Sequence, residues 1–130
     1  MSRPGFKQQL FTQFARVAKA LGNANRLELL EFLAQGDRDV ESLATVSGLS
    51  IANTSQHLQV LRQTGLVASR KSGQHVIYGI SGLDVVELLA DLQRVSEARL
   101  AEIDRLVESF LKVKDELESV PIALIPFNPE

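Results

Sequence analysis

Apolar residues recur at helical spacing over the first third of the chain. Between residues 4 and 20 they return every three or four positions, which predicts an amphipathic helix that stops at Gly22. A second helix is predicted over 24–35, with Asn23 as its N-cap. A third, shorter helix is predicted to follow the cap Asp39 and to run through Val46.

A tight turn over 47–50 and a fourth helix over 51–63 come next. Gly48 suits the left-handed conformation that ends a helix, and Ser50 is a favourable N-cap. One side of this helix is apolar, and the other side carries uncharged amides at Asn53, Gln56, Gln59 and Gln63. A solvent-facing helix would normally carry Lys and Glu there, whereas Asn and Gln can pair bidentately with adenine. The pattern favours a helix that reads base edges, with simple solvation of the amides as the alternative.

Alternation of polar and apolar residues replaces helical spacing after Gly65. Two short strands are predicted over 66–70 and 75–80, joined by the polar segment from Lys71 to Gln74. Because this segment contains glycine, it suits a hairpin turn. Helices at this spacing followed by a hairpin predict a winged helix-turn-helix.

The motifs within this pattern are Leu21-Gly22-Asn23-Ala24-Asn25-Arg26-Leu27 with Leu30, Asp39-Val40-Glu41-Ser42-Leu43-Ala44, Ser47-Gly48-Leu49-Ser50, Ser55-Gln56-His57-Leu58, Leu61-Arg62, Gly65-Leu66-Val67 and Gly73…Tyr78. Together they resemble the winged helix-turn-helix of the ArsR (arsenical-resistance repressor) family, over roughly residues 14–83. The resemblance implies a homodimeric transcriptional regulator, a repressor, that binds double-stranded DNA at an inverted repeat. The alternative is a winged-helix module that binds protein and has no sequence-specific DNA binding.

A long fifth helix is predicted from Leu83 to about Leu117. At about 1.5 Å per residue it would extend roughly 50 Å, farther than the small domain that it leaves. Its distal apolar residues therefore need a partner, most simply the same helix of a second copy, joined by the Phe-rich first helix. The predicted dimer interface comprises Leu10, Phe11, Phe14, Leu88, Leu92, Val95, Ile103, Leu106 and Phe110. The predicted fold is mainly α with a small β-hairpin, dimeric through the N-terminal and the long C-terminal helices.

Residues 1–118 are expected to form this DNA-binding and dimerisation domain. Residues 119–130 contain Pro121, Pro126 and Pro129 and predict an extended tail, either a linker or an arm. No apolar run approaches the ~18 residues that span a bilayer, and no signal peptide precedes the first helix. The sequence predicts a cytoplasmic protein with no membrane partner.

Composition excludes several kinds of functional site. Cysteine is absent from the 130 residues, which excludes disulfides, Cys-ligated zinc and a cysteine nucleophile. The chain has no phosphate-binding loop and no Ser/His/Asp motif, so an enzyme is not expected. A net charge of −2 argues at first against nucleic acid. However, no Asp or Glu occurs between Glu41 and Asp84, where Arg62, Arg70 and Lys71 lie, so the predicted DNA face is locally basic.

The predicted DNA-binding residues form two groups. The fourth helix would contact base edges through Asn53 and Gln56, and the resemblance adds base-edge or phosphate contacts at Ser55 and Gln59. Phosphate contacts are predicted for Arg62, Arg70 and Lys71, with Gln74 and His75 also in the hairpin. For His75, contact with the minor groove is the other functional interpretation, and an ordinary strand histidine remains the alternative to both.

Metal sensing is not expected. His57 lies on the core side of its helix, which favours a packed, hydrogen-bonded histidine over a ligand. Family members that bind metal on the long helix use an Asp and a His near its start, then a His or Glu about a dozen residues later. This chain has Asp84, then Val86 where that His would be, then Glu97, and two carboxylates suit a transition metal poorly. We expect no cofactor, and any effector would be an unidentified small molecule or another partner.

Overall fold

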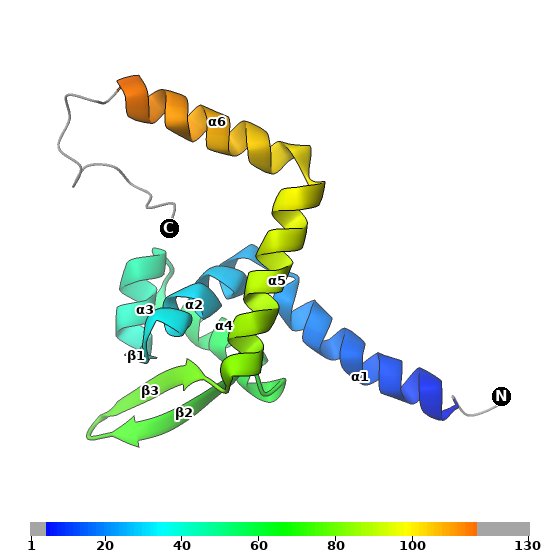
Figure 1. Ribbon diagram of the computed structural model, residues 1–130. Coiled ribbons are helices and arrows are strands. Elements are labelled where there is room, and N and C mark those ends of the chain that lie inside the picture. The colour runs from blue at the N-terminus through cyan, green and yellow to red at the C-terminus, as the bar shows by residue number, and fades with distance from the viewer. Residues whose placement is uncertain (1–4, 117–130) are drawn as a thin grey trace. The chain divides into compact units, whose positions relative to one another are not determined.

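The computed structural model describes residues 5–116, whose helices and strands are shown in Figure 1. They are α1 (Phe6–Leu21), α2 (Ala24–Gln35), β1 (Arg38–Asp39), α3 (Val40–Ser47), α4 (Ile51–Gln63), β2 (Val67–Ser72), β3 (His75–Ile80), α5 (Leu83–Arg99) and α6 (Ala101–Glu116). The described residues form two compact units, which divide between Leu89 and Ala90. The predicted tail and the domain boundary at residue 118 lie outside the described residues.

The predicted starts of α2, α3 and α4 are confirmed by their caps. In each case the cap side chain accepts a hydrogen bond from the backbone N–H three residues later, which satisfies a donor that the helix leaves unpaired. The pairs are Asn23 with Arg26, Asp39 with Ser42, and Ser50 with Asn53. Gly48 ends α3 with a φ of 74°, the left-handed conformation expected of it. The turn between α3 and α4 is therefore set by local chemistry.

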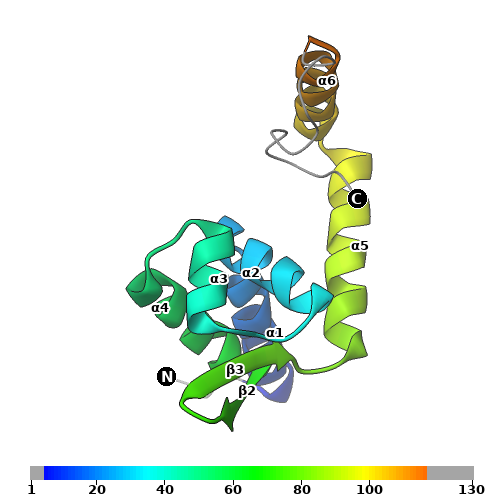
Figure 2. The same cartoon turned by 90° about the vertical axis from the view of Figure 1, so that its left-hand side faces the viewer.

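The core of the first unit lies between α2, α3, α4 and the sheet. α3 packs against α4, α2 packs against β3, and α4 packs against β2, and Figure 2 shows α2 and α3 on one side of the sheet. The fully buried large side chains are Leu29, Leu30, Leu43, Leu58, Leu61 and Thr54. Leucines from three helices thus meet in one cluster, to which the hairpin adds Val67 and Tyr78.

The sheet has one strand more than the predicted hairpin. Its order is β1-β3-β2 and all pairings are antiparallel, with the two residues of β1 paired to Tyr78 and Ile77 of β3. The hairpin turn is also tighter than predicted, since Ser72 already pairs with His75. Gly73 has a φ of 62°, which allows the two-residue turn and extends β2 beyond Arg70.

The prediction of one long helix after the hairpin is wrong. Two helices, α5 and α6, meet at Leu100. The backbone N–H of Leu100 still donates to the carbonyl of Ser96, while its own carbonyl accepts from Ile103, three residues ahead. The hydroxyl of Ser96 donates to the carbonyl of Leu92 at 2.7 Å, an interaction that weakens and bends helices. The apolar residues assigned to one stripe are therefore divided between two helix axes.

Candidate nucleic-acid interface

The inner side of α4 anchors this helix to the core. Thr54, Leu58 and Leu61 are fully buried. The hydroxyl of Thr54 donates to the carbonyl of Ser50 at 2.8 Å, so the one polar group on this side is satisfied within the helix. With three buried side chains along its length, α4 has a fixed rotation about its own axis.

That rotation exposes the predicted reading side of α4. Asn53, Gln56, Gln59 and Arg62 are exposed, and Ser55 is half-buried. Among the described residues, no hydrogen bond engages the side-chain amides of Asn53, Gln56 or Gln59. Their donors and acceptors are therefore available to a ligand, as contact with base edges requires.

The hairpin β2–β3 carries the remaining predicted contacts, and Figure 1 shows it extending from the helices of this unit. The side chains of Arg70, Lys71, Gln74 and His75 are all exposed. Arg70 lies within β2 as predicted, and Lys71 lies there too rather than in the turn, while Gln74 lies at the hairpin tip beside Gly73. The structure brings these four residues together on one projecting element.

The charge at this hairpin is less positive than the sequence indicates. Arg70 lies 3.7 Å from the carboxylate of Asp37, and Nδ1 of His75 lies 3.3 Å from that of Asp39. Both acids come from the β1 region, before the acid-free stretch that begins after Glu41. The locally basic face predicted from sequence therefore needs correction, because β1 places two carboxylates beside it.

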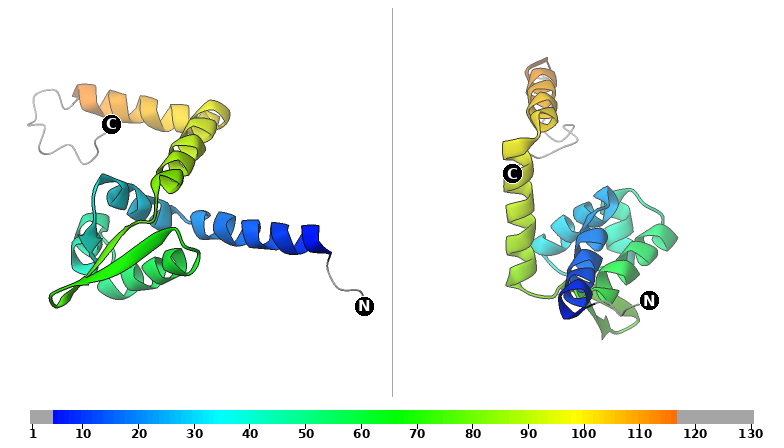
Figure 3. Two further views of the ribbon diagram at one scale, coloured as in Figure 1. Left: turned by 60° about the horizontal axis from the view of Figure 1, so that its bottom comes forward. Right: turned by 90° about the vertical axis from the view of Figure 1, so that its right-hand side faces the viewer.

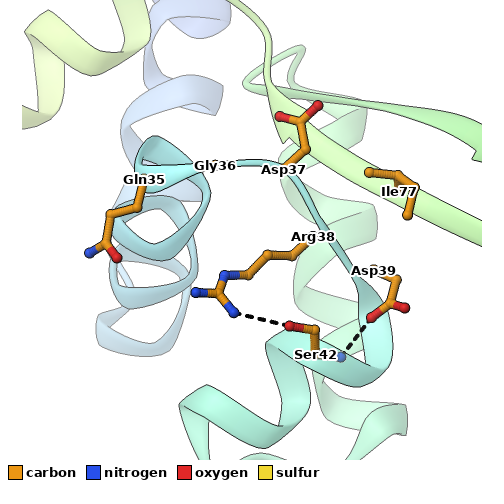
Figure 4. A pocket seen from close by; sticks show the side chains of 7 residues that line it. All are labelled: Gln35, Gly36, Asp37, Arg38, Asp39, Ser42 and Ile77. Atoms are coloured by element: carbon orange, nitrogen blue, oxygen red, sulfur yellow. Dashed lines mark hydrogen bonds between the residues drawn. The ribbon is translucent and has the colours of Figure 1, made fainter.

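A shallow pocket of about 380 Å³ adjoins these acids. Figure 4 shows Arg38 directed to Ser42, to which it donates a hydrogen bond of 3.0 Å, while Asp37 and Asp39 lie on the other side of the backbone. This alternation is what a strand produces, and it turns both carboxylates toward the outer side of the sheet. The pocket itself is lined mainly by the polar residues of this turn.

His57 is half-buried on α4, and its Nδ1 lies 3.5 Å from Nη1 of Arg26. This supports the packed interpretation of that histidine. Sequence reasoning did not identify Arg26 as a residue that links elements, although its place in the first turn after the cap Asn23 was visible. In the described part of the chain, no group of three or more His, Cys, Asp or Glu residues could hold a metal ion.

The predicted interface residues of α1 are exposed. Phe11 and Phe14 are 56% and 54% exposed, and their rings contact each other edge to face, with centroids 5.4 Å apart. Figure 3 shows the N-terminal part of α1 clear of the other elements of its unit. Leu10 and Leu88 of this unit are exposed too. A single chain thus leaves an aromatic surface on α1 without cover.

The second unit also presents apolar side chains to solvent. Leu92 and Val95 of α5 and Leu106 of α6 are exposed, whereas Ile103 and Phe110 are half-buried. None of the described helices is long and apolar enough to cross a membrane. Exposed apolar side chains such as Leu92, Val95 and Leu106 are candidates for contact with another protein chain.

Comparison with known proteins identifies the family. The model of the family "Bacterial regulatory protein, arsR family" matches residues 23–69. HTH-type transcriptional regulator Rv0324 of Mycobacterium tuberculosis is 44% identical over 97 residues, which are 75% of this chain and 43% of that longer protein. The "uncharacterized HTH-type transcriptional regulator Rv0081" of the same organism is 39% identical over 104 residues, 76% of this chain and 91% of that protein.

Solved structures agree with this assignment. A homodimeric winged helix-turn-helix DNA-binding domain from Mycobacterium bovis superimposes with a TM-score of 0.71 at 41% identity, covering 78% of this chain and 94% of that one. The chain belongs to the arsR family of bacterial regulatory proteins, and it is a winged helix-turn-helix transcriptional regulator rather than an enzyme.

Proposed function

We propose that this protein binds double-stranded DNA as a homodimer and represses transcription from the sites that it occupies. In each protomer α4 enters a major groove, and the hairpin follows the adjacent backbone. The observation that carries the proposal is the side of α4 bearing Asn53, Gln56 and Gln59, whose amides are exposed and have no partner among the described residues. The buried opposite side keeps these amides directed outward.

The contact residues divide by chemistry. Asn53, Gln56, Ser55 and Gln59 contact base edges or adjacent phosphates from α4, where amides can bond to a base through both a donor and an acceptor. The backbone is held by Arg62, Arg70, Lys71, Gln74 and His75. Phosphate contacts of this kind fix the register of the protein on the duplex and carry no sequence information.

Homodimerisation follows from the uncovered apolar surfaces. Phe11 and Phe14 of α1 would be covered by the partner, together with apolar residues of α5 and α6. The homodimeric state of the similar Mycobacterium bovis domain supports dimerisation as such. Two-fold symmetry would present two copies of α4 to half-sites roughly 34–36 Å apart, so the operator would be an imperfect inverted repeat.

The test is selection of bound duplexes from a random pool, followed by titration of the selected sequence at several salt concentrations. We expect an inverted repeat and an affinity that falls steeply as salt rises, because counterions are released from the phosphates. Transcription in vitro from a promoter that overlaps the repeat should then fall when the protein is added. Absence of any salt-dependent affinity for duplex DNA would instead favour a protein-interaction module. We place this activity in the cytoplasm, where the DNA of a bacterial cell lies.

A further inference from the structure

The register of the sheet places acidic and basic residues on its outer side. Asp39 of β1 pairs with Ile77 of β3, and Ile77 pairs with Arg70 of β2, so these three residues form one row across the sheet. His75 is two positions from Ile77 and shares its side. The opposite side carries Tyr78, which is buried in the core. The outer side is thus solvent-facing and holds Arg70 and His75 of the hairpin together with the carboxylates of Asp37 and Asp39.

Each of the two basic side chains on this side, Arg70 and His75, faces a carboxylate of its own. Arg70 lies 3.7 Å from Asp37, and His75 lies 3.3 Å from Asp39. The Asp39 carboxylate is fixed in place, because its other oxygen accepts a 2.7 Å hydrogen bond from the backbone N–H of Ser42 at the start of α3.

Gly79 makes room for the other carboxylate. A Cβ built at this position would lie 2.5 Å from Oδ1 of Asp37 and 2.9 Å from its Cγ, closer than carbon and oxygen atoms approach in proteins. The φ of Gly79 is not in the left-handed region, so the backbone does not require glycine here. The absence of a side chain lets Asp37 lie over β3 and face Arg70 on the strand beyond.

A guanidinium bonds to carboxylate and phosphate oxygens through the same N–H groups and in the same geometry. We propose that Asp37 and Asp39 are internal competitors of DNA phosphate, which hold Arg70 and His75 in the free protein and lower its affinity for every DNA sequence. This inference rests on the proposed function, which places the hairpin on the DNA backbone.

The competition has a signature in the salt dependence of binding. When Arg70 transfers to a phosphate, Asp37 is left without its partner and takes up a cation from solution. This uptake offsets the release of a counterion from the phosphate, which contributes about 0.9 to the magnitude of the log–log salt slope. While Asp37 is present, Arg70 should therefore add less to the magnitude of the salt slope than an ordinary phosphate contact does.

The test replaces each acid by its amide and measures binding to a random-sequence duplex over a range of salt. Asp37→Asn should raise the affinity of the dimer on the order of 2- to 10-fold, since exposed ion pairs are weak, and should steepen the salt slope by up to about one unit per subunit. Asp39→Asn should act in the same direction, and Asn retains the N-cap of α3. Glu28→Gln, an equal change of charge at an exposed position of α2, is the matched control and should change little.

Gly79→Ala supplies a test without any change of charge. The added methyl group should displace the Asp37 carboxylate from Arg70 and raise affinity toward that of Asp37→Asn. Thermal unfolding of each variant, followed by circular dichroism, confirms that the compared proteins are folded. If Gly79→Ala is folded and binds as the wild type does, a role for the position of Asp37 is rejected.

A double-mutant cycle with Arg70→Gln completes the test. In the Arg70→Gln background, the effect of Asp37→Asn should largely disappear. The inference would be overturned if Asp37→Asn raised DNA affinity as much in the Arg70→Gln background as in the wild type. It would also be overturned if Asp37→Asn changed affinity no more than Glu28→Gln does, or if it weakened binding. If the proposed function itself were wrong, the result would be different, because the wild type would then show no salt-dependent affinity for DNA.

Discussion

The guanidinium of Arg26 lies 3.5 Å from Nδ1 of His57 and so joins the first turn of α2 to α4. The same group donates through Nε to the carbonyl of Ala20 at 2.6 Å and through Nη2 to that of Lys19 at 3.0 Å. These carbonyls belong to the last turn of α1, where a helix leaves acceptors unpaired and favours a positive charge. One side chain therefore connects the helix proposed for dimerisation with the helix proposed for reading DNA.

We expect Arg26→Gln to lower the free energy of unfolding by about 1.5–3 kcal/mol, the range for hydrogen bonds that involve a charged group. Urea unfolding followed by circular dichroism measures this change. Arg16→Gln is the matched control, because Arg16 is exposed and contacts Gln13 of its own helix. Equal stability of the two variants would show that the three interactions of Arg26 contribute nothing beyond those of a surface arginine.

Base reading and phosphate binding should separate by mutation. Gln56→Ala should reduce the preference for the operator over its single-base variants by about 1–3 kcal/mol for each bidentate pair that it removes, and leave the salt slope nearly unchanged. Arg62→Ala should weaken binding to all sequences and lower the magnitude of the slope by about 0.9 per subunit. Arg62 suits this measurement because it has no acidic partner among the described residues. The reverse pattern would mean that α4 does not lie in the major groove.

The oligomeric state should depend on α1. Sedimentation at micromolar concentration should give about twice 14.3 kDa for the wild type. Phe11→Ser removes an exposed ring whose burial by a partner is worth about 1.5–3 kcal/mol in each subunit, so it should shift the equilibrium toward monomer. Gln8→Ala, at another exposed position of the same helix, should not. A wild-type protein that sediments as a monomer would contradict the proposed dimer.

Metal ions should leave DNA binding unchanged. The chain has no cysteine, and its histidines are His57 on α4 and His75 on β3, so α5 and α6 offer carboxylates alone. Borderline metals prefer imidazole or thiolate ligands. Titration of the protein–DNA complex with Zn²⁺, Ni²⁺ and arsenite tests this expectation. Release of DNA by micromolar amounts of any of them would reveal a ligand set that neither sequence nor fold indicates.

The features that sequence predicted well are those with local causes. The caps Asn23, Asp39 and Ser50 act on backbone groups three residues away, and the side of α4 that is buried follows from its own periodicity. β1 was missed because a two-residue strand has no periodicity, and it exists through pairing with β3, about forty positions later in the chain. The two acid–base pairs at the hairpin depend on that pairing, so they were missed with it. The break at Leu100 had a weak local signal, the hydroxyl of Ser96, without any proline or glycine to mark it.

The exposure of α1 has a consequence for the lifetime of the protein in the cell. Within α1 as the structure describes it, Ala20 is the one fully buried residue. An isolated helix of sixteen residues is only marginally stable in water. Before a newly made chain meets its partner, we expect this segment to unfold often and to be open to proteases. Degradation would then remove unpaired chains first. Below a certain rate of synthesis, unpaired chains would then be degraded faster than they can form dimers.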